Sequence, residues 1–409
     1  MLKDDPAAAD GVRAPAAGDI IKLPALANTF RTLAKEGKKG FYTGRIAEEL
    51  VKVVQDLGGH LELDDLQNHL EIGSEPVEAI SLKFRGQNAG RGTEADGVEV
   101  WEHPPNGQGI VALMALGIIQ ELESQGKIPT FKPEDHNTAP YLHVILEALR
   151  IAFADASWFV TDPNVVKVPA AELISQPYLA ERAKLFDPSA ASGIIQHGDP
   201  YRSPALTSSD TVYFACSDSQ GNAISFINSN YGGFGTCIIP RGCGFTLQNR
   251  AANFSLDPAH PNALAPRKRP YHTIIPGLVT NLPDGSLHSV FGVMGGFMQP
   301  QGHVQVLLGQ VAGGLNPQQA LDAPRVCIGA GMPDEGDVYD LTVYVEEGMP
   351  QETIEGLKKL GHKVSLVTGM GRGLFGRGQI IRYTVDTVEG TGLWSGGSDM
   401  RGDGAAYPV

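Results

Sequence analysis

One stretch constrains this chain more than any other: a run of small polar residues that ends at Asp210 and passes into Thr211. A β-type run covers residues 211–216, a turn signal rich in Asp, Ser, Gly and Asn covers 218–222, and a second β-type run covers 223–228. Two such runs joined by a short glycine-containing loop predict a β-hairpin. Taken alone, Thr211 is better explained as an ordinary strand residue, because threonine is common in sheets.

Composition and charge exclude several classes of protein. The 409 residues are 42% hydrophobic and 19% charged, enough for one large domain or two smaller ones. The formal net charge of −14 argues against a nucleic-acid partner, because phosphate binding needs clustered Lys and Arg. The longest apolar stretch, residues 110–119, is about half the length of a membrane span. Residues 1–6 lack the apolar core of a signal peptide, so we expect a soluble chain of undetermined compartment.

The order of the predicted elements favours a layered α+β fold. Predicted helices cover residues 24–37, 45–57, 110–122, 139–156, 301–311 and 350–360. Predicted strands outside the hairpin cover residues 80–84, 98–101, 287–293, 339–346, 363–367 and 379–385. Asp64 and Asn316 are predicted helix N-caps. Strands and helices in separate runs indicate antiparallel sheets rather than a doubly wound parallel sheet. The Gly/Pro/Ser-rich residues 188–206 predict an exposed segment before Thr211.

Several familiar kinds of site are disfavoured. The eleven histidines and four cysteines show neither an HExxH motif nor a CxxC pair, so we predict no metal and no cofactor. The cysteines are predicted to be free buried thiols, although Cys237 and Cys243 are close enough in sequence to pair. Arg401-Gly402-Asp403 is interpreted as a chance match to an adhesion motif. The absence of a Gly-x-Ser-x-Gly elbow argues against an α/β-hydrolase.

A threonine behind a flexible segment and ahead of two strands suits an N-terminal nucleophile hydrolase. Cleavage between Asp210 and Thr211 would free an α-amine on the residue that carries the hydroxyl. That amine can act as general base, because its pKa lies far closer to neutral than that of a lysine. Gly295 and Gly296 follow a predicted strand, and amides without a neighbouring Cβ are suited to an oxyanion hole.

Short motifs are spread in order from about Gly18 to the C-terminus. In the first half they are Phe41-Tyr42-x-Gly44, Asp64-Asp65-Leu66, Pro104-Pro105-x-x-x-Gly109 and Phe153-Ala154-Asp155. In the second half they are residues 211–222, Gly235, Gly242-x-Gly244, Gln248-Asn249-x-x-x-Asn253-Phe254-Ser255, Arg269-Pro270, Gly295-Gly296, Gln379 and Ser398-Asp399-x-Arg401-x-Asp403-Gly404-Ala405-Ala406. Together these motifs resemble the γ-glutamyltransferase, or glutathione hydrolase, family of N-terminal nucleophile hydrolases.

The resemblance implies a four-layer αββα sandwich made as one precursor and cleaved before Thr211. Residues 1–210 would be the remainder of the large subunit and residues 211–409 the small catalytic subunit. The two fragments would stay associated as one interwoven domain. The substrate would be a small molecule with a γ-glutamyl amide bond, and water or an amine would accept the acyl group.

The resemblance also implies roles for individual residues. Thr211 matches the family's nucleophile, Ser229 matches a second hydroxyl beside it, and Gly295 and Gly296 match the oxyanion pair. The substrate-binding positions of the family fall on Asn230, Tyr231, Arg250, Asn253, His272 and Thr273, and all of these but Asn230 depart from its pattern.

These departures leave the substrate open. Asn253 stands where the family has an acid for the glutamyl α-ammonium, and Arg250 replaces a Glu or Gln. An Arg there would repel an ammonium and bind a carboxylate, which predicts an acylase for glutaryl-type amides as the alternative. Arg250 could equally point to solvent or pair with a structural acid. The family also has a large N-terminal stretch that precedes the part matched here, so a non-catalytic relative is the third alternative.

Overall fold

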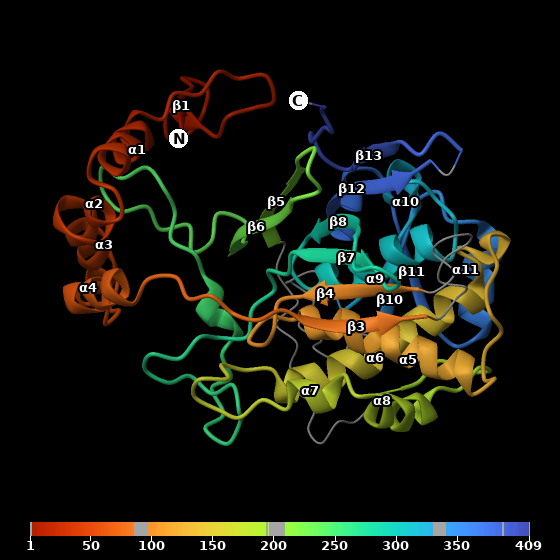
Figure 1. Cartoon of the computed structure of the whole chain (residues 1–409). Helices are drawn as coiled ribbons and strands as arrows, with labels where there is room; N and C mark the ends of the chain where they lie inside the picture. The colour runs from red at the N-terminus through yellow and green to blue at the C-terminus, as the bar shows by residue number, and fades with distance from the viewer. Residues whose placement is uncertain are drawn as a thin grey trace. The chain divides into compact units, whose positions relative to one another are not determined.

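The computed structural model describes residues 2–85, 97–193, 195, 209–329, 341–386 and 388–408. The chain divides into two compact units, a smaller one of Met1–Pro76 with Phe234–Gln248 and a larger one of Val77–Gly233 with Asn249–Val409 (Figure 1). Every residue predicted for the active site lies in the larger unit. The predicted exposed segment lies largely outside the described residues.

The smaller unit is mainly helical. Its elements are β1 Lys3–Asp4, β2 Val12–Arg13, α1 Pro24–Glu36, α2 Lys39–Tyr42, α3 Gly44–Asp56 and α4 Leu63–Ile72. Helix α1 begins with Pro24 and ends at Glu36, and the cap residue Gly37 has a φ of 63°, a positive value that glycine adopts without strain. The loop of residues 234–248 packs on this helix: a Cβ atom at Gly244 would collide with the backbone of Leu26.

Two local predictions are wrong. Helix α4 begins at Leu63, and the side chain of Asp65 accepts a 2.9 Å hydrogen bond from the Glu62 amide, so Asp64 lies inside the first turn and is not the cap. All four cysteines are free, but Cys216 and Cys237 are exposed rather than buried.

The larger unit is built on a six-stranded antiparallel sheet with the order β13-β12-β8-β7-β4-β3. The strands are β3 Ile80–Phe84, β4 Val98–Glu102, β7 Gly277–Asn281, β8 Leu287–Met294, β12 Arg377–Val385 and β13 Gly392–Ser398. Two strands come from residues before the predicted cleavage site and four from residues after it. Residues on both sides of the predicted cleavage site thus contribute strands to one sheet; the cleavage, and the two interwoven fragments that it would make, stay predictions.

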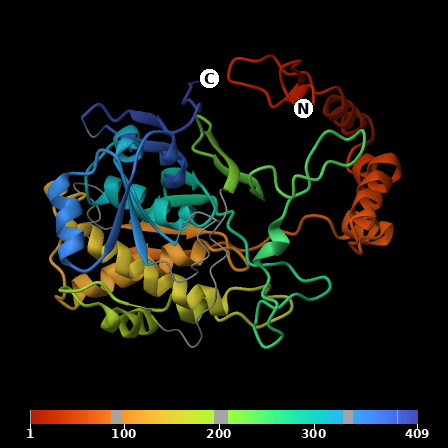
Figure 2. The same ribbon diagram turned by 180° about the vertical axis from the view of Figure 1, so that it is seen from behind.

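Strand β8 lies between two layers. The hairpin of β5 Ser209–Ser217 and β6 Ala223–Gly232 covers one face of the sheet, and α9 Met298–Val311 covers the other (Figures 1 and 2). A Cβ atom at Gly292 would collide with the ring of Tyr213 in the hairpin, and one at Gly302 of α9 would collide with Val293. Gly292 and Val293 are neighbours in β8, and successive strand residues point to opposite faces. The glycines thus allow both layers to approach the sheet closely.

The hydrophobic core lies between the sheet and its helices. Helices α5 Gly109–Ser124 and α6 Ala139–Phe159 are buried along most of their length and, with α9, supply most of its side chains. The remaining elements are η2 Pro133–Asp135, α7 Ala170–Leu173, α8 Gln176–Arg182, η3 Ala183–Leu185, η4 Arg250–Asn253, α10 Pro317–Asp322, α11 Gln351–Lys359, η6 Gly369–Phe375, and a second sheet of β9 Val326–Ile328, β10 Thr342–Glu346 and β11 Lys363–Val367. As predicted, Asn316 caps its helix through Gln319. The α+β fold class is confirmed.

No helix within the described residues has the length and apolar character needed to cross a bilayer.

A buried ion network fixes the C-terminal motif. Asp399 accepts hydrogen bonds from Arg325 at 2.7 Å and from Arg401 at 2.9 Å, and Arg401 also donates to Glu346 at 2.6 Å. The side chains in these pairs are at most 2% exposed. Arg401 is therefore an internal residue, which explains why the Arg401-Gly402-Asp403 tripeptide is not displayed as an adhesion motif.

Candidate active site

Thr211 lies on the inner face of the hairpin. Along β5, Thr211 and Tyr213 are 2% and 7% exposed, whereas Val212 and Phe214 are 66% and 48% exposed. The alternation is that of a strand with one face packed, and the ring of Tyr213 lies against Gly292. The Thr211 side chain is therefore turned inward rather than toward solvent.

The Thr211 hydroxyl is hydrogen-bonded to Ser229. Its Oγ1 donates to Ser229 Oγ at 3.0 Å, and the same Ser229 oxygen accepts from the Tyr231 amide at 2.8 Å. The hairpin register shifts here: Asp210 pairs with Tyr231 and Thr211 pairs with Ser229, which leaves Asn230 as an extra residue. Such bulges locally interrupt the ladder and re-aim side chains. The irregularity falls at the peptide bond predicted to be cleaved.

Tyr231 joins this hydroxyl pair to a buried cation. Its φ of 76° is rare for a residue with a bulky side chain. Its ring lies under the Arg250 guanidinium, 4.9 Å from Cζ to the ring centroid, and Arg250 Nη1 donates to Thr273 Oγ1 at 2.6 Å. Burial lowers the pKa of Arg250 to about 10, and Tyr231 opposes part of that shift. Arg250 is therefore charged at neutral pH, and it does not point to solvent.

His272 supplies a neutral ring beside Arg250. Burial is the main reason why its pKa falls to about 3, and the neighbouring charge of Arg250 adds to it. Asn253 is buried, and its Nδ2 donates to the Tyr271 carbonyl at 3.0 Å. Asn230 is held by its backbone, since its carbonyl accepts from the Asn249 amide at 3.1 Å. None of the six predicted substrate-binding residues is a carboxylate, so Arg250 sets the charge of this group.

Gly295 and Gly296 connect β8 to α9. Their φ values of 131° and 59° are ones that glycine adopts readily. The Gly295 carbonyl accepts from the Met298 amide at 3.0 Å, and the Gly296 carbonyl accepts from the Gln299 amide at 3.1 Å. Because C=O and N–H point in opposite directions across a trans peptide, the Gly296 N–H points away from the helix. This is the orientation that an oxyanion donor at a helix start requires.

Gln108, which sequence reasoning missed, joins the glycine pair to the cation. Its Nε2 donates to the Gly296 carbonyl at 2.8 Å and to the Thr273 carbonyl at 3.3 Å, and its Oε1 accepts from the Tyr271 hydroxyl at 3.1 Å. Gln108 is one of the variable positions in the Pro104-Pro105-x-x-x-Gly109 motif, and that motif is the signal that could have found it. The structure thus connects Thr211, Ser229, Tyr231, Arg250, Thr273, Gln108 and Gly296 in one chain of contacts.

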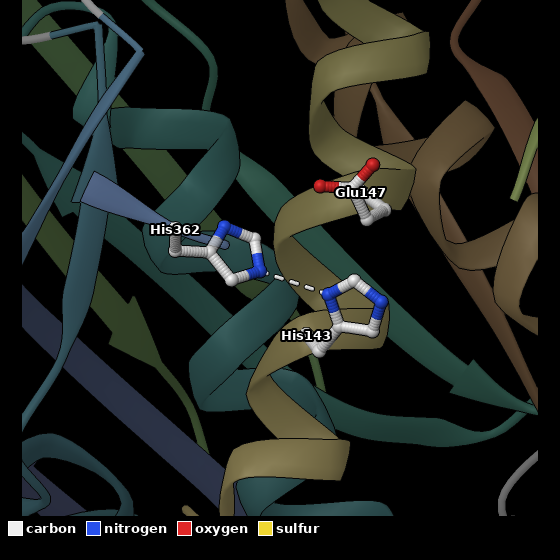
Figure 3. A group of neighbouring side chains, drawn as sticks. All are labelled: His143, Glu147 and His362. Carbon is white, nitrogen blue, oxygen red and sulfur yellow. Dashed lines mark hydrogen bonds between the residues drawn. The ribbon is translucent and has the colours of Figure 1, made fainter. Parts of the chain in front are cut away.

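A second cluster of potential metal ligands lies on α6, although the sequence predicted no metal. His143 and Glu147 are one helical turn apart, and His362 follows α11, with ligand atoms within 4.8 Å of one another (Figure 3). His143 Nε2 can only donate to the Asp187 carbonyl, at 2.9 Å. Its Nδ1 therefore accepts from His362 Nε2 at 2.8 Å. The two rings form a donor–acceptor pair.

The carboxylate of this cluster is also engaged. Glu147 Oε1 accepts from Arg150 Nη1 at 2.7 Å, and its Oε2 accepts from the Ser192 amide at 3.1 Å. A metal ion would have to displace the Arg150 guanidinium and remove the proton between the two histidines. This geometry favours a buried hydrogen-bond network, and we assign no metal to it.

Comparison with known proteins gives consistent matches. The family model described as gamma-glutamyltranspeptidase matches residues 7–409. The glutathione hydrolase-like YwrD proenzyme of Bacillus subtilis is 33% identical over 397 residues, which are 97% of this chain and 68% of that protein. The oxamate amidohydrolase proenzyme of Klebsiella pneumoniae is 33% identical over 393 residues, 96% of this chain and 66% of that protein.

A solved structure agrees with the fold. The crystal structure of cephalosporin acylase from Bacillus halodurans matches with a TM-score of 0.79 and 38% identity, over 97% of this chain and 65% of that one. The chain thus spans about two thirds of the length of these relatives. With a family model that covers residues 7–409 and a fold of the N-terminal nucleophile type, the chain belongs to the gamma-glutamyltranspeptidase family.

Proposed function

We propose that this chain is the precursor of a threonine amidohydrolase. In the proposal it cleaves itself before Thr211 and then hydrolyses amides whose acyl group carries a carboxylate but no α-ammonium. The observation that carries the proposal is the inward Thr211 hydroxyl, bonded to Ser229 at the bulge beside the Asp210–Thr211 peptide. Family membership supports hydrolase or acyltransferase chemistry. The cleavage site and the substrate are the parts proposed here.

Self-cleavage would begin with attack of Thr211 Oγ1 on the Asp210 carbonyl carbon. The hydroxyl proton leaves through Ser229, and the Thr211 nitrogen takes up a proton as the C–N bond breaks. The resulting ester joins Asp210 to the Thr211 side chain. Water then hydrolyses the ester, which leaves a carboxylate on Asp210 and a free α-amine on Thr211.

Turnover would use the freed amine as general base. The amine accepts the hydroxyl proton while Oγ1 of Thr211 bonds to the substrate carbonyl carbon. The amide hydrogens of Gly295 and Gly296 stabilise the oxyanion. The C–N bond then breaks, the leaving amine takes the proton, and water hydrolyses the acyl ester to regenerate Thr211.

The positive charge of Arg250, beside Tyr231, favours an acyl group with a carboxylate over one with an α-ammonium. Arg250 is cationic at neutral pH, and Asn253 offers no negative charge. A glutamyl α-ammonium would meet a like charge, whereas a carboxylate would meet a guanidinium suited to bind it. Oxamate, the substrate in the name of one relative, is an amide with a carboxylate and no ammonium. The glutathione hydrolase-like relative favours a γ-glutamyl amide as the second candidate.

Hydrolysis of matched substrates by processed protein tests the proposal. Glutaryl and γ-glutamyl anilides differ only in the α-ammonium, and oxamate adds a short acyl group. We expect a preference for the carboxylate-only acyl group, and Arg250→Gln should lower kcat/KM for it by about 10- to 100-fold, the worth of a charged hydrogen bond. Arg267→Gln is the control, because Arg267 is exposed.

Three outcomes separate the alternatives. A γ-glutamyl preference that Arg250→Gln leaves unchanged contradicts the proposed acyl specificity. If a folded and processed protein hydrolyses neither the two anilides nor oxamate, amides with a carboxylate-bearing acyl group are rejected as its substrates. A folded chain that neither cleaves itself nor hydrolyses any amide indicates the non-catalytic relative.

A further inference from the structure

We propose that Gln108 is a positioning residue. It holds the carbonyl of Gly296, the residue whose N–H would serve the oxyanion hole, in register with the acyl-binding group around Arg250. The inference rests on the proposed function. It adds a residue that takes no part in the bond-making steps described above.

The Gln108 side chain spans the two halves of the site. Its Nε2 contacts the carbonyls of Gly296 and Thr273, at 2.8 and 3.3 Å. Gly296 is the second residue of the proposed oxyanion pair. The side-chain hydroxyl of Thr273 accepts a hydrogen bond from Arg250. Gln108 is completely buried. One rigid amide group therefore fixes the distance between the two elements.

The orientation of this amide is determined by its partners. Both Nε2 hydrogens point to carbonyl oxygens, and Oε1 accepts from the Tyr271 hydroxyl at 3.1 Å. Turning the amide over would place Oε1 against two carbonyl oxygens and leave buried polar groups unsatisfied. The arrangement has one low-energy state, which suits a group that must keep a backbone carbonyl fixed.

The backbone around Gln108 is tied to the same loop. The Gln108 amide donates to the His272 carbonyl at 3.1 Å, and the His272 amide donates to the Asn106 carbonyl at 3.0 Å. On the other side, the ring of Tyr271 stacks on Phe297, with centroids 5.7 Å apart and an interplanar angle of 11°. Phe297 directly follows Gly296. The carbonyl that Gln108 holds belongs to the Gly296–Phe297 peptide. The ring stack of Phe297 on Tyr271 thus supports the same peptide from its other end.

An isosteric substitution tests this role. Gln108→Glu keeps the shape and the acceptor for Tyr271 but, when ionised, presents an oxygen to the two carbonyls. We expect kcat to fall by about 10- to 100-fold near neutral pH, less than the loss of a whole oxyanion donor, with KM within about threefold. As the pH falls and the new carboxyl group takes up a proton, it can donate again, and kcat should recover relative to that of the parent protein at the same pH. Gln108→Leu should show the loss without the recovery.

The matched control is Gln305→Glu. Gln305 is also buried and donates to two carbonyls, those of Gln301 and Val326 at 2.9 and 3.0 Å, but on the β9 side of α9. Its kcat should stay close to that of the parent protein. An equal loss in Gln305→Glu, or a parental kcat in Gln108→Glu, overturns the proposal.

Two further readouts keep the result unambiguous. Mass spectrometry shows whether each variant is processed, and failure of the parent protein to process or hydrolyse any amide counts against the proposed function rather than against Gln108. If both Gln108 variants fail to fold, Tyr271→Phe decides, because it removes only the hydroxyl that holds Oε1. A severalfold lower kcat with unchanged KM supports the inference, and an unchanged kcat overturns it.

Discussion

The Thr211 hydroxyl donates a hydrogen bond to the Ser229 hydroxyl across the hairpin, with the two oxygens 3.0 Å apart. Ser229 also accepts from the Tyr231 amide, so its oxygen is held from a second side. A hydroxyl fixed in this way can orient the Thr211 proton and relay it. The pair gives the predictions for Ser229 and Thr211 their geometric basis.

Ser229→Ala should slow both processing and turnover by about 10- to 100-fold while the protein stays folded, because a positioned proton-transfer group contributes on that order or more. Timed gels and anilide hydrolysis measure the two rates. Ser225→Ala is the control, since Ser225 lies on the same strand and bonds to the Tyr213 hydroxyl at 2.9 Å instead. Equal rates in the two variants would make Ser229 a structural residue.

Binding of an acyl carboxylate should weaken at high pH. The pKa of Arg250 is lowered to about 10, so the guanidinium is charged below that pH and loses its proton above it. KM for the glutaryl anilide should therefore rise as pH passes through about 10, whereas KM for an anilide with a neutral acyl group should not. A KM for the glutaryl substrate that does not change with pH, measured where circular dichroism shows that the protein stays folded, would show that Arg250 does not bind the acyl carboxylate.

The His143–His362 pair should make the larger unit acid-sensitive. Burial, with help from Arg150 and His143, lowers the pKa of His362 to about 3, below the usual value near 6.5. Below about pH 6.5 the unfolded chain binds a proton that the folded chain does not, so one such group lowers the free energy of unfolding by about 1.4 kcal/mol per pH unit. His362→Gln keeps a donor for His143 and should reduce this slope in urea titrations between about pH 8 and pH 4. Parallel pH profiles for the two proteins would contradict the assignment.

Asp399→Ala should destabilise the fold strongly. The substitution leaves the buried guanidiniums of Arg325 and Arg401 without their shared carboxylate, a loss of about 3–5 kcal/mol in the free energy of unfolding. Glu355→Gln is the control, because it breaks an exposed pair with Lys358 and should cost less than about 1 kcal/mol. Urea unfolding of both variants measures the difference, and similar small losses would show that the network contributes little.

Much of the fold could be predicted because its signals are local. The hairpin, the apolar helices α5 and α6 and the Asn316 cap each follow from a short pattern of residues. Strand β13 was missed because Gly392, Gly396 and Gly397 weaken its β-propensity, and it is stabilised by pairing with β12. Strand β7 is short and sandwiched between β4 and β8, where pairing rather than sequence pattern defines it.

The site was predictable only in part. Family motifs gave Thr211, Ser229 and the glycine pair, but the roles of these residues remain predictions. Contacts across long sequence separations could not be foreseen: Gln108 and Gly296 are 188 positions apart, and His143 and His362 are 219 apart. The environment of Arg250 could not be predicted from its neighbours in sequence either. It depends on tertiary structure, because the guanidinium is buried against the ring of Tyr231.

Intact mass measurement of the purified chain over time, with Thr211→Ala beside it, tests the central claim most directly. The account predicts that the parent protein separates into residues 1–210 and 211–409, with threonine at the new N-terminus. Thr211→Ala should remain whole while its circular dichroism matches that of the parent before cleavage. A folded parent chain that stays uncleaved, or cleavage that persists in Thr211→Ala, would contradict the assignment of Thr211 as the nucleophile.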